Sequence, residues 1–171
     1  MNPEVLATNV LNLLRGICWH PESSKGGWTQ DGKWVRITFE PDPRDFRFCM
    51  GDHARCIKGL QHVASSISRQ YGNYEAVISL IQNYSGNGEK EEHEFAQDPA
   101  FDHSKITDTS AGLLASAFGR PVHLRVNRQN DKLELLTKTD NQREAAILKA
   151  LGEVLYAYGY RNGIIIKLAE A

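Results

Sequence analysis

The sequence of 171 residues lacks the features of secreted and membrane proteins. It has only three cysteines, an odd number without a Cys-x-x-Cys pair, which argues against a disulfide framework. No apolar run approaches the roughly 20 residues that a membrane span requires. The first fourteen residues carry Glu4 and no basic segment of the kind that begins a signal peptide. We therefore expect a soluble, cytoplasmic protein without a membrane partner.

A basic excess is also missing. The formal net charge is -1, which counts against a strong phosphate-driven binder, because nucleic-acid affinity depends largely on lysine and arginine. Five acidic side chains crowd one short stretch that contains only Lys90 against them: Glu89, Glu91, Glu92, Glu94 and Asp98. Outside this stretch both halves of the chain are slightly positive, by roughly one or two charges.

Catalytic signatures are missing as well. Cys56 with a histidine, and the Ser65-Ser66 pair near His62, are the only combinations of a nucleophile and a base, and neither lies in a recognised catalytic motif. The segment Gly86-x-Gly88 is no phosphate-binding loop, because it opens no helix and lacks the lysine pattern. We therefore expect a protein that is not an enzyme and that uses no cofactor.

One set of residues has some of the character of a metal site. Cys49, His53 and Cys56 are spaced as Cys-x3-His-x2-Cys, with His62 beyond them. This spacing is not a standard zinc set, and it lacks a reliable fourth ligand. Cys49 and Cys56 are predicted to be small core residues, and no metal is expected.

What the sequence does contain is typical of a globular protein, with 41% hydrophobic and 24% charged residues. Its clearest boundary is the stretch 84–100, where glycines are followed by like charges. This composition predicts a flexible linker between two small domains, 1–83 and 101–171. The alternative is one long surface loop in a single domain.

The first half is predicted to follow the order helix, strand, strand, helix, strand. Helical spacing of apolar residues predicts the two helices, and alternation of β-forming residues predicts the strands. The glycine-rich residues 21–32 are predicted to form a turn. The five elements, in chain order, are 3–17, 33–39, 46–50, 54–71 and 76–81.

The second half is predicted to repeat this order, with a turn at 127–131. Its elements are 106–118, 122–126, 132–137, 141–158 and 164–168. A shift of about 88 residues superposes the halves and places Leu60 on Leu148 and Val77 on Ile165. We therefore expect an α+β protein with two tandem units, each a three-stranded sheet with helices packed on one face.

The run from Gly51 to Leu60 resembles the glycine loop and the following helix of the KH domain. It is most similar to small bacterial KH proteins of the helix-first, type II order. Gly51, Arg55, Ile57 and Leu60 match the family pattern Gly-Lys-x-Gly-Arg-x-Ile-x-Ala-Leu. The resemblance covers about residues 3 to 83. It implies a KH fold that binds RNA or single-stranded DNA in a shallow groove beside the loop.

The sequence departs from the family pattern at two loop positions. Asp52 stands where the family has lysine, and it places a negative charge where phosphate is expected. Ala54 replaces the second glycine and disfavours a positive φ. In the second half the matching loop, residues 139–143, has no glycine at all. There Asp140-Asn141 is predicted to be a helix N-cap, and hydrogen bonding to bases is the alternative.

The resemblance implies that the loop and the cations around it contact nucleic acid. Trp28, in a glycine-rich segment, is the candidate for stacking on a base, whereas Trp19 and Trp34 are predicted to be core residues. The alternative function is a degenerate KH scaffold that binds another protein. RNA and DNA both stay open, as does the oligomeric state. The expected nucleic-acid-binding residues are Gly51, Asp52, His53, Ala54, Arg55, Lys58, Arg47 and Trp28.

Overall fold

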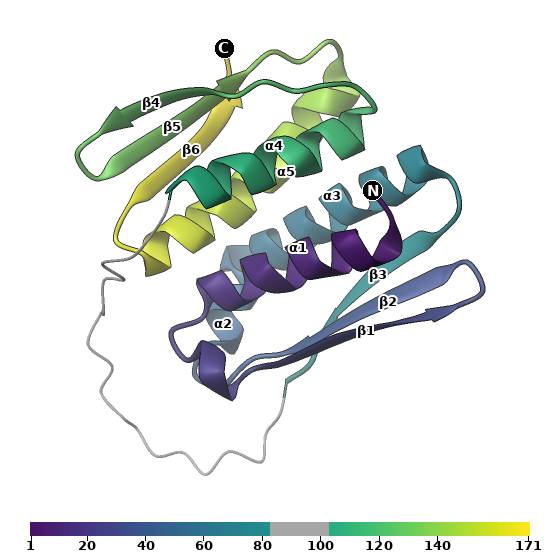
Figure 1. The fold of residues 1–171 in the computed structure, drawn as a ribbon. Helices are drawn as coiled ribbons and strands as arrows, with labels where there is room; N and C mark the ends of the chain where they lie inside the picture. The colour runs from purple at the N-terminus through teal and green to yellow at the C-terminus, as the bar shows by residue number, and fades with distance from the viewer. Residues whose placement is uncertain (83–102) are drawn as a thin grey trace.

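The computed structural model describes residues 1–82 and 103–171 of the chain. It is an α+β structure with two three-stranded sheets and helices packed against them (Figure 1). The predicted linker at 84–100 lies outside the described residues.

The elements of the first half are two long helices, one short helix and three strands. They are α1 (Pro3–Ile17), β1 (Lys25–Asp31), β2 (Trp34–Glu40), α2 (Phe46–Met50), α3 (Arg55–Tyr71) and β3 (Glu75–Leu80). Short 3-10 turns lie at Pro21–Ser23 and Asp52–Ala54. The elements of the second half are α4 (His103–Phe118), β4 (Arg125–Gln129), β5 (Lys132–Thr137), α5 (Gln142–Arg161) and β6 (Ile165–Glu170).

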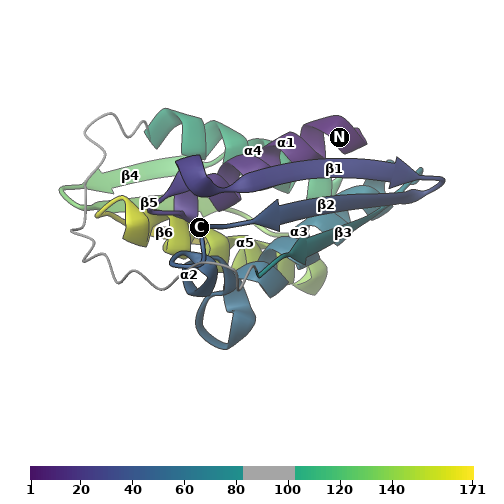
Figure 2. The ribbon, with the colours of Figure 1, turned by 90° about the horizontal axis from the view of Figure 1, so that it is seen from below.

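The two sheets have the same topology. In the first sheet the strand order is β1-β2-β3, with β1 antiparallel and β3 parallel to β2 (Figure 2). In the second sheet the order is β4-β5-β6, again with one antiparallel and one parallel pair. A parallel pair needs a long crossover. Helix α3 supplies it in the first half, and α5 supplies it in the second.

The sheets lie on the outside of the molecule and the helices lie between them (Figure 1). Helices α1 and α3 contact the first sheet, α5 contacts β6, and α3 packs against α5. A side chain at Gly59 would place its Cβ 2.5 Å from the carbonyl oxygen of Ala150, so the absence of a side chain lets α3 and α5 approach closely. The inward sheet residues and the helices form one apolar core that extends through both halves.

Residues 46–50 form helix α2, so the predicted strand there is wrong. Phe46 and Phe48 are spaced by two residues, as in a strand, but so short a run cannot separate strand from helix by periodicity. In the helix, Cys49 is fully buried and the Phe48 ring stacks on Trp19 at 5.9 Å. Tertiary packing therefore decides the conformation of this segment.

The predicted turn at 21–32 is also wrong in most of its length, because Lys25–Asp31 form strand β1. Gly26 lies where β1 passes α1, and a Cβ there would be 2.8 Å from Leu11 Cδ2. The glycine thus permits a close approach of strand and helix instead of marking a turn.

In the second half the first strand is displaced along the chain. The predicted strand 122–126 is observed as β4 at Arg125–Gln129, and the predicted turn at 127–131 shrinks to its last two residues. Asn130 takes the positive φ of 44° that this tight turn requires. In the ranges 1–82 and 103–171, no helix combines the length and the apolar character needed to cross a bilayer.

Candidate functional site

The site begins at Gly51, where helix α2 ends. Gly51 has φ +76°, and its N–H donates to the carbonyl oxygen of Arg47 at 3.0 Å. A Cβ at this position would lie 2.8 Å from both the N and the Cβ of Cys56. Both the backbone conformation and the space beside it therefore require glycine.

The next residues form a strained turn. His53 has φ 52° and Ala54 has φ 58°, in the left-handed region that residues with a side chain seldom adopt. The Ala54 N–H donates to the carbonyl oxygen of Gly51 at 3.1 Å and closes the turn. The side chains of Asp52 and His53 are about four-fifths exposed and lie 3.1 Å apart. Strain of this kind persists where the surrounding structure enforces it, and it concentrates at functional sites.

Helix α3 starts directly after the turn. Ala54 occupies its N-cap position and offers no side-chain acceptor to the first N–H groups of the helix. Arg55 is the first helical residue and is exposed. A cation opposes the helix dipole at this end, whereas an anion would be favoured.

Asp45 holds α2 against the end of α1. Its carboxylate is fully buried and accepts hydrogen bonds from the N–H groups of Trp19 at 3.1 Å and His20 at 2.8 Å. Cys49 adds a second contact, since its Sγ lies 3.6 Å from that of Cys18. The position of α2, and with it the Gly51 turn, is therefore fixed by buried contacts.

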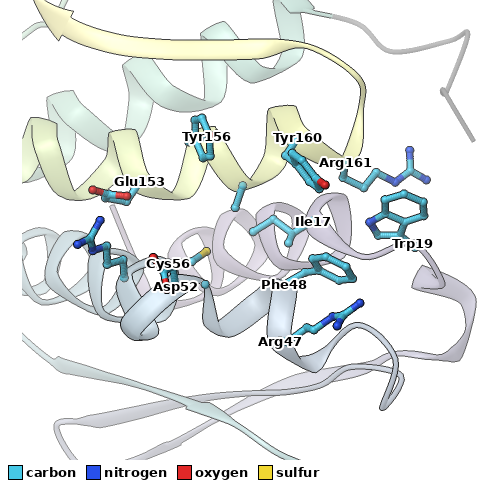
Figure 3. Close-up of a pocket in the computed structure, with 13 residues that line it drawn as sticks. Ile17, Trp19, Arg47, Phe48, Asp52, Cys56, Glu153, Tyr156, Tyr160 and Arg161 are labelled. Carbon is cyan, nitrogen blue, oxygen red and sulfur yellow. The ribbon is translucent and has the colours of Figure 1, made fainter. Parts of the chain in front are cut away.

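An open cleft of about 560 Å³ lies between the Gly51 turn and helix α5 (Figure 3). One wall comes from α1, α2 and the turn, and the other comes from the C-terminal half of α5. We call it the Gly51 cleft. Its lining residues are Ile17, Trp19, Arg47, Phe48, Gly51, Asp52, Arg55, Cys56, Glu153, Tyr156, Ala157, Tyr160 and Arg161.

Four aromatic side chains line the Gly51 cleft from both walls. On one wall the Trp19 and Phe48 rings are stacked at 24° to one another. On the other wall Tyr156 and Tyr160 are 58% and 59% exposed, although each ring is large and mostly apolar. The exposed tyrosine rings can take up a flat apolar group by stacking.

Three arginines and two carboxylates set the charge of the cleft. The Arg47 guanidinium lies over the Phe48 ring, 5.0 Å from its centroid. Arg161 donates from Nε to the carbonyl oxygen of Cys18 at 3.0 Å. Asp52 and Glu153 partly offset the arginines, so the lining as a whole is weakly positive.

The structure brings together four of the eight residues expected from the sequence. Gly51, Asp52, Arg55 and Arg47 line the Gly51 cleft, and His53 and Ala54 complete the turn beside it. Lys58 is exposed on α3 but does not line the cleft. Trp28 lies on β1 opposite Ile37, away from the lining, and is 37% exposed.

Sequence reasoning missed the wall that α5 contributes. Tyr156 and Tyr160 are four residues apart, so they lie on one face of α5, apart from its buried leucines. This spacing is a signal that could have been found. Trp19, predicted to be a core residue, is half-buried at the edge of the cleft, while Trp34 is 48% exposed on the outer sheet face.

The cysteines serve packing. Cys49 and Cys56 are buried, while His53 points into solvent, so these residues do not converge. The neighbouring Cys18 thiol and burial raise the pKa of Cys49, and burial raises the pKa of Cys56 to about 12. Within the described residues, no group of three or more His, Cys, Asp or Glu side chains could hold a metal ion.

No protein-family model, curated protein or solved structure matches the chain.

Proposed function

We propose that the chain consists of two KH-like modules and binds single-stranded RNA or DNA in the Gly51 cleft, without catalysing a reaction. The observation that carries this proposal is the lining of the cleft, where aromatic rings and arginines from two walls surround the Gly51 turn. Binding sites for single strands combine these two features, with aromatic faces for the bases and cations for the backbone.

The Gly51 turn suits the phosphate backbone. Gly51 has no side chain, and the N–H groups of the first turn of α3 have no side-chain cap within the described residues. Free N–H groups at the start of a helix favour an anion, and Arg55 stands beside them. The KH resemblance of residues 51–60 assigns the same role to this turn.

The weak net charge of the cleft limits how strongly the affinity should depend on salt concentration. Because each neutralised phosphate on a single strand contributes about 0.7 to the slope of log affinity against log salt, three arginines limit that slope to about 2. Asp52 repels phosphate and lowers affinity. Stacking on Tyr156 and Tyr160 should therefore supply much of the binding free energy, at about 1–3 kcal/mol for each stacked base.

Fluorescence anisotropy with labelled pools of short single-stranded RNA and DNA, repeated over a salt series, tests this. The Tyr156→Ala and Tyr160→Ala changes should each lower affinity about tenfold or more. Tyr71→Ala is the matched control, since Tyr71 is 44% exposed on α3 and does not line the cleft. It should leave affinity unchanged.

The Arg55→Ala change should lower affinity and reduce the salt slope by about 0.7, while Asp52→Asn should raise affinity several-fold. Arg36→Ala, an exposed arginine on β2 outside the cleft lining, is the control for charge. Absence of binding at low salt, or equal losses in the Tyr71 control, contradicts the proposal. That result would favour the alternative function, a KH-like scaffold that binds another protein, which suits the near-neutral net charge.

A further inference from the structure

A second cleft adjoins the Gly51 cleft on the far side of Tyr156. It is open, has a volume of about 490 Å³ and lies between α5 and β6, and we call it the α5–β6 cleft. Glu153 and Tyr156 line both clefts, so the two share a border along α5. Gly152, next to Glu153, leaves its part of this second cleft without a side chain.

The α5–β6 cleft is more basic than the first one. Lys132, Lys149 and Lys167 line it, and Glu153 is the only carboxylate among the described residues of the lining. Within the described residues, none of the three lysines forms an ion pair. Three lysine ammonium groups around one apolar groove favour a polyanion with apolar faces.

Most of the remaining lining comes from the apolar edge of the second sheet. Ile165 is 51% exposed, and the strand that carries it, β6, is an edge strand of the second sheet. An edge strand offers backbone N–H and C=O groups that no neighbouring strand pairs. The cleft thus combines apolar contact, hydrogen-bonding groups and positive charge.

We infer that a bound single strand continues from the Gly51 cleft over Tyr156 into the α5–β6 cleft, so that one strand contacts both halves of the protein. This inference rests on the proposed function and extends it with a path and a minimum length. The Tyr156 ring, exposed at the shared border, is the stacking step between the two clefts.

The length requirement follows from helix geometry. Tyr160 and Lys149 are eleven residues apart on α5, which is about 16 Å along the helix axis. A stacked strand of about four nucleotides, the length that a KH loop clamps, spans only about 10 Å at roughly 3.4 Å per step. A strand of about ten nucleotides reaches both clefts.

The test compares labelled oligouridylates and oligothymidylates of about four and about ten nucleotides, each titrated over a salt series. Affinity alone is not decisive, because the longer strand offers about seven registers to a four-nucleotide site. The salt slope is decisive. Three lysines should make it steeper for the long strand by about 2.

The variant carries Lys132→Gln, Lys149→Gln and Lys167→Gln together. We expect it to lower the salt slope of the long strand to that of the short strand and to leave binding of the short strand unchanged. The control carries Lys25→Gln, Lys105→Gln and Lys138→Gln, which make the same charge change at exposed lysines outside both linings. Thermal unfolding verifies that both variants fold.

Equal slopes for the two lengths in the wild-type protein overturn the inference, and so do equal losses in the control. If short strands still bind and Tyr160→Ala weakens them, the proposed function stands while the extended path fails, and an extended peptide beside β6 becomes the better occupant. If neither length binds, both proposals fail together.

Discussion

The two halves build the same sheet topology but start their long helices in different ways. In the second half, Asn141 caps α5, since its Oδ1 accepts a hydrogen bond from the Glu144 N–H at 2.9 Å. Glu144 reaches back and accepts one from the Asp140 N–H at 3.0 Å. In the first half, α3 starts from Ala54 in the left-handed region, without such a cap.

The same corner of the second half is closed further by Arg120. Its guanidinium donates to Glu144 Oε1 at 2.6 Å and to the carbonyl oxygen of Lys138 at 3.0 Å. The hydrogen bonds that Glu144 accepts from Arg120 and from the Asp140 N–H lower the pKa of Glu144, which is almost fully buried. One half therefore satisfies its helix start internally, and the other leaves it strained and open, which is why we place the nucleic-acid backbone at the Gly51 turn.

The largest expected effect on stability is at Gly51, where the addition of one methyl group should disrupt the turn that distinguishes the first half from the second. Gly51→Ala imposes a side chain at φ +76° and places its Cβ against the backbone of Cys56. Left-handed strain and overpacking together should lower the free energy of unfolding by about 3 kcal/mol. Urea denaturation with an unchanged m-value measures this.

Gly112→Ala is the matched control on the other half. Gly112 lies inside α4 and has an ordinary φ, and a Cβ at this position would meet no atom within 4 Å. Alanine there should stabilise the protein by up to about 1 kcal/mol. An equal loss of stability in both variants would mean that the turn places no special demand on residue 51.

The next largest effect concerns the connection between β2 and α2 in the first half. The second half has no helix that corresponds to α2, because β5 is followed directly by α5. The Asp42 carboxylate accepts hydrogen bonds from the backbone N–H and the guanidinium of Arg44 at 2.9 Å. These bonds lower its pKa from 3.8 to about 2. The pair therefore stabilises the fold fully above about pH 4, and its contribution disappears as the pH falls towards 2.

Asp42→Asn should lower the free energy of unfolding by about 1–2 kcal/mol at neutral pH, a value reduced for the partial exposure of Arg44. Denaturation of both proteins at several pH values measures the difference. It should shrink between pH 4 and 2. A difference that stays constant over this range argues against the ion pair as the cause.

The sequence predicts the long helices and most strands well, and β5 is observed at its predicted bounds, 132–137, whereas α2 and β1 were missed. The helix predicted at 3–17 is observed with those bounds, and the one predicted at 54–71 starts one residue later. Their apolar spacing repeats over several turns and leaves no other solution. Residues 46–50 are too few to show a period, and contacts with Cys18 and Trp19, which are distant in sequence and follow α1, make them helical.

For a related reason, only one wall of the candidate site could be predicted from the sequence. The Gly51 turn can be predicted from the local sequence, because a glycine directly precedes a helix. The opposite wall lies about 100 residues later. The spacing of Tyr156 and Tyr160 places both rings on one face of α5, but nothing local tells that this face meets the turn. The glycines around Trp28 predict a loop that could present its ring to a base, whereas β1 holds Trp28 in the sheet.

A smaller effect tests the cap of the second half. Asn141→Ala removes the acceptor for the Glu144 N–H and should lower the free energy of unfolding by about 1 kcal/mol. Binding of short single strands should not change, because Asn141 lies outside both clefts. Equilibrium denaturation and anisotropy on the same variant check both statements. Loss of binding of short strands would mean that the second helix start is itself part of the site.

The smallest expected effect is a gain in stability, at the strained start of α3. Ala54→Gly relieves the left-handed strain at φ 58°, which outweighs the added freedom of glycine in the unfolded chain, so the variant should gain about 0.5–1 kcal/mol. The same replacement at Ala146, exposed in the first turns of α5, should instead lose about 1 kcal/mol. Stabilities of opposite sign, measured by urea denaturation, would locate the strain at the start of α3 alone. A loss in both variants would mean that the first helix start is as relaxed as the second, and the reason for placing the nucleic-acid backbone there would fall with it.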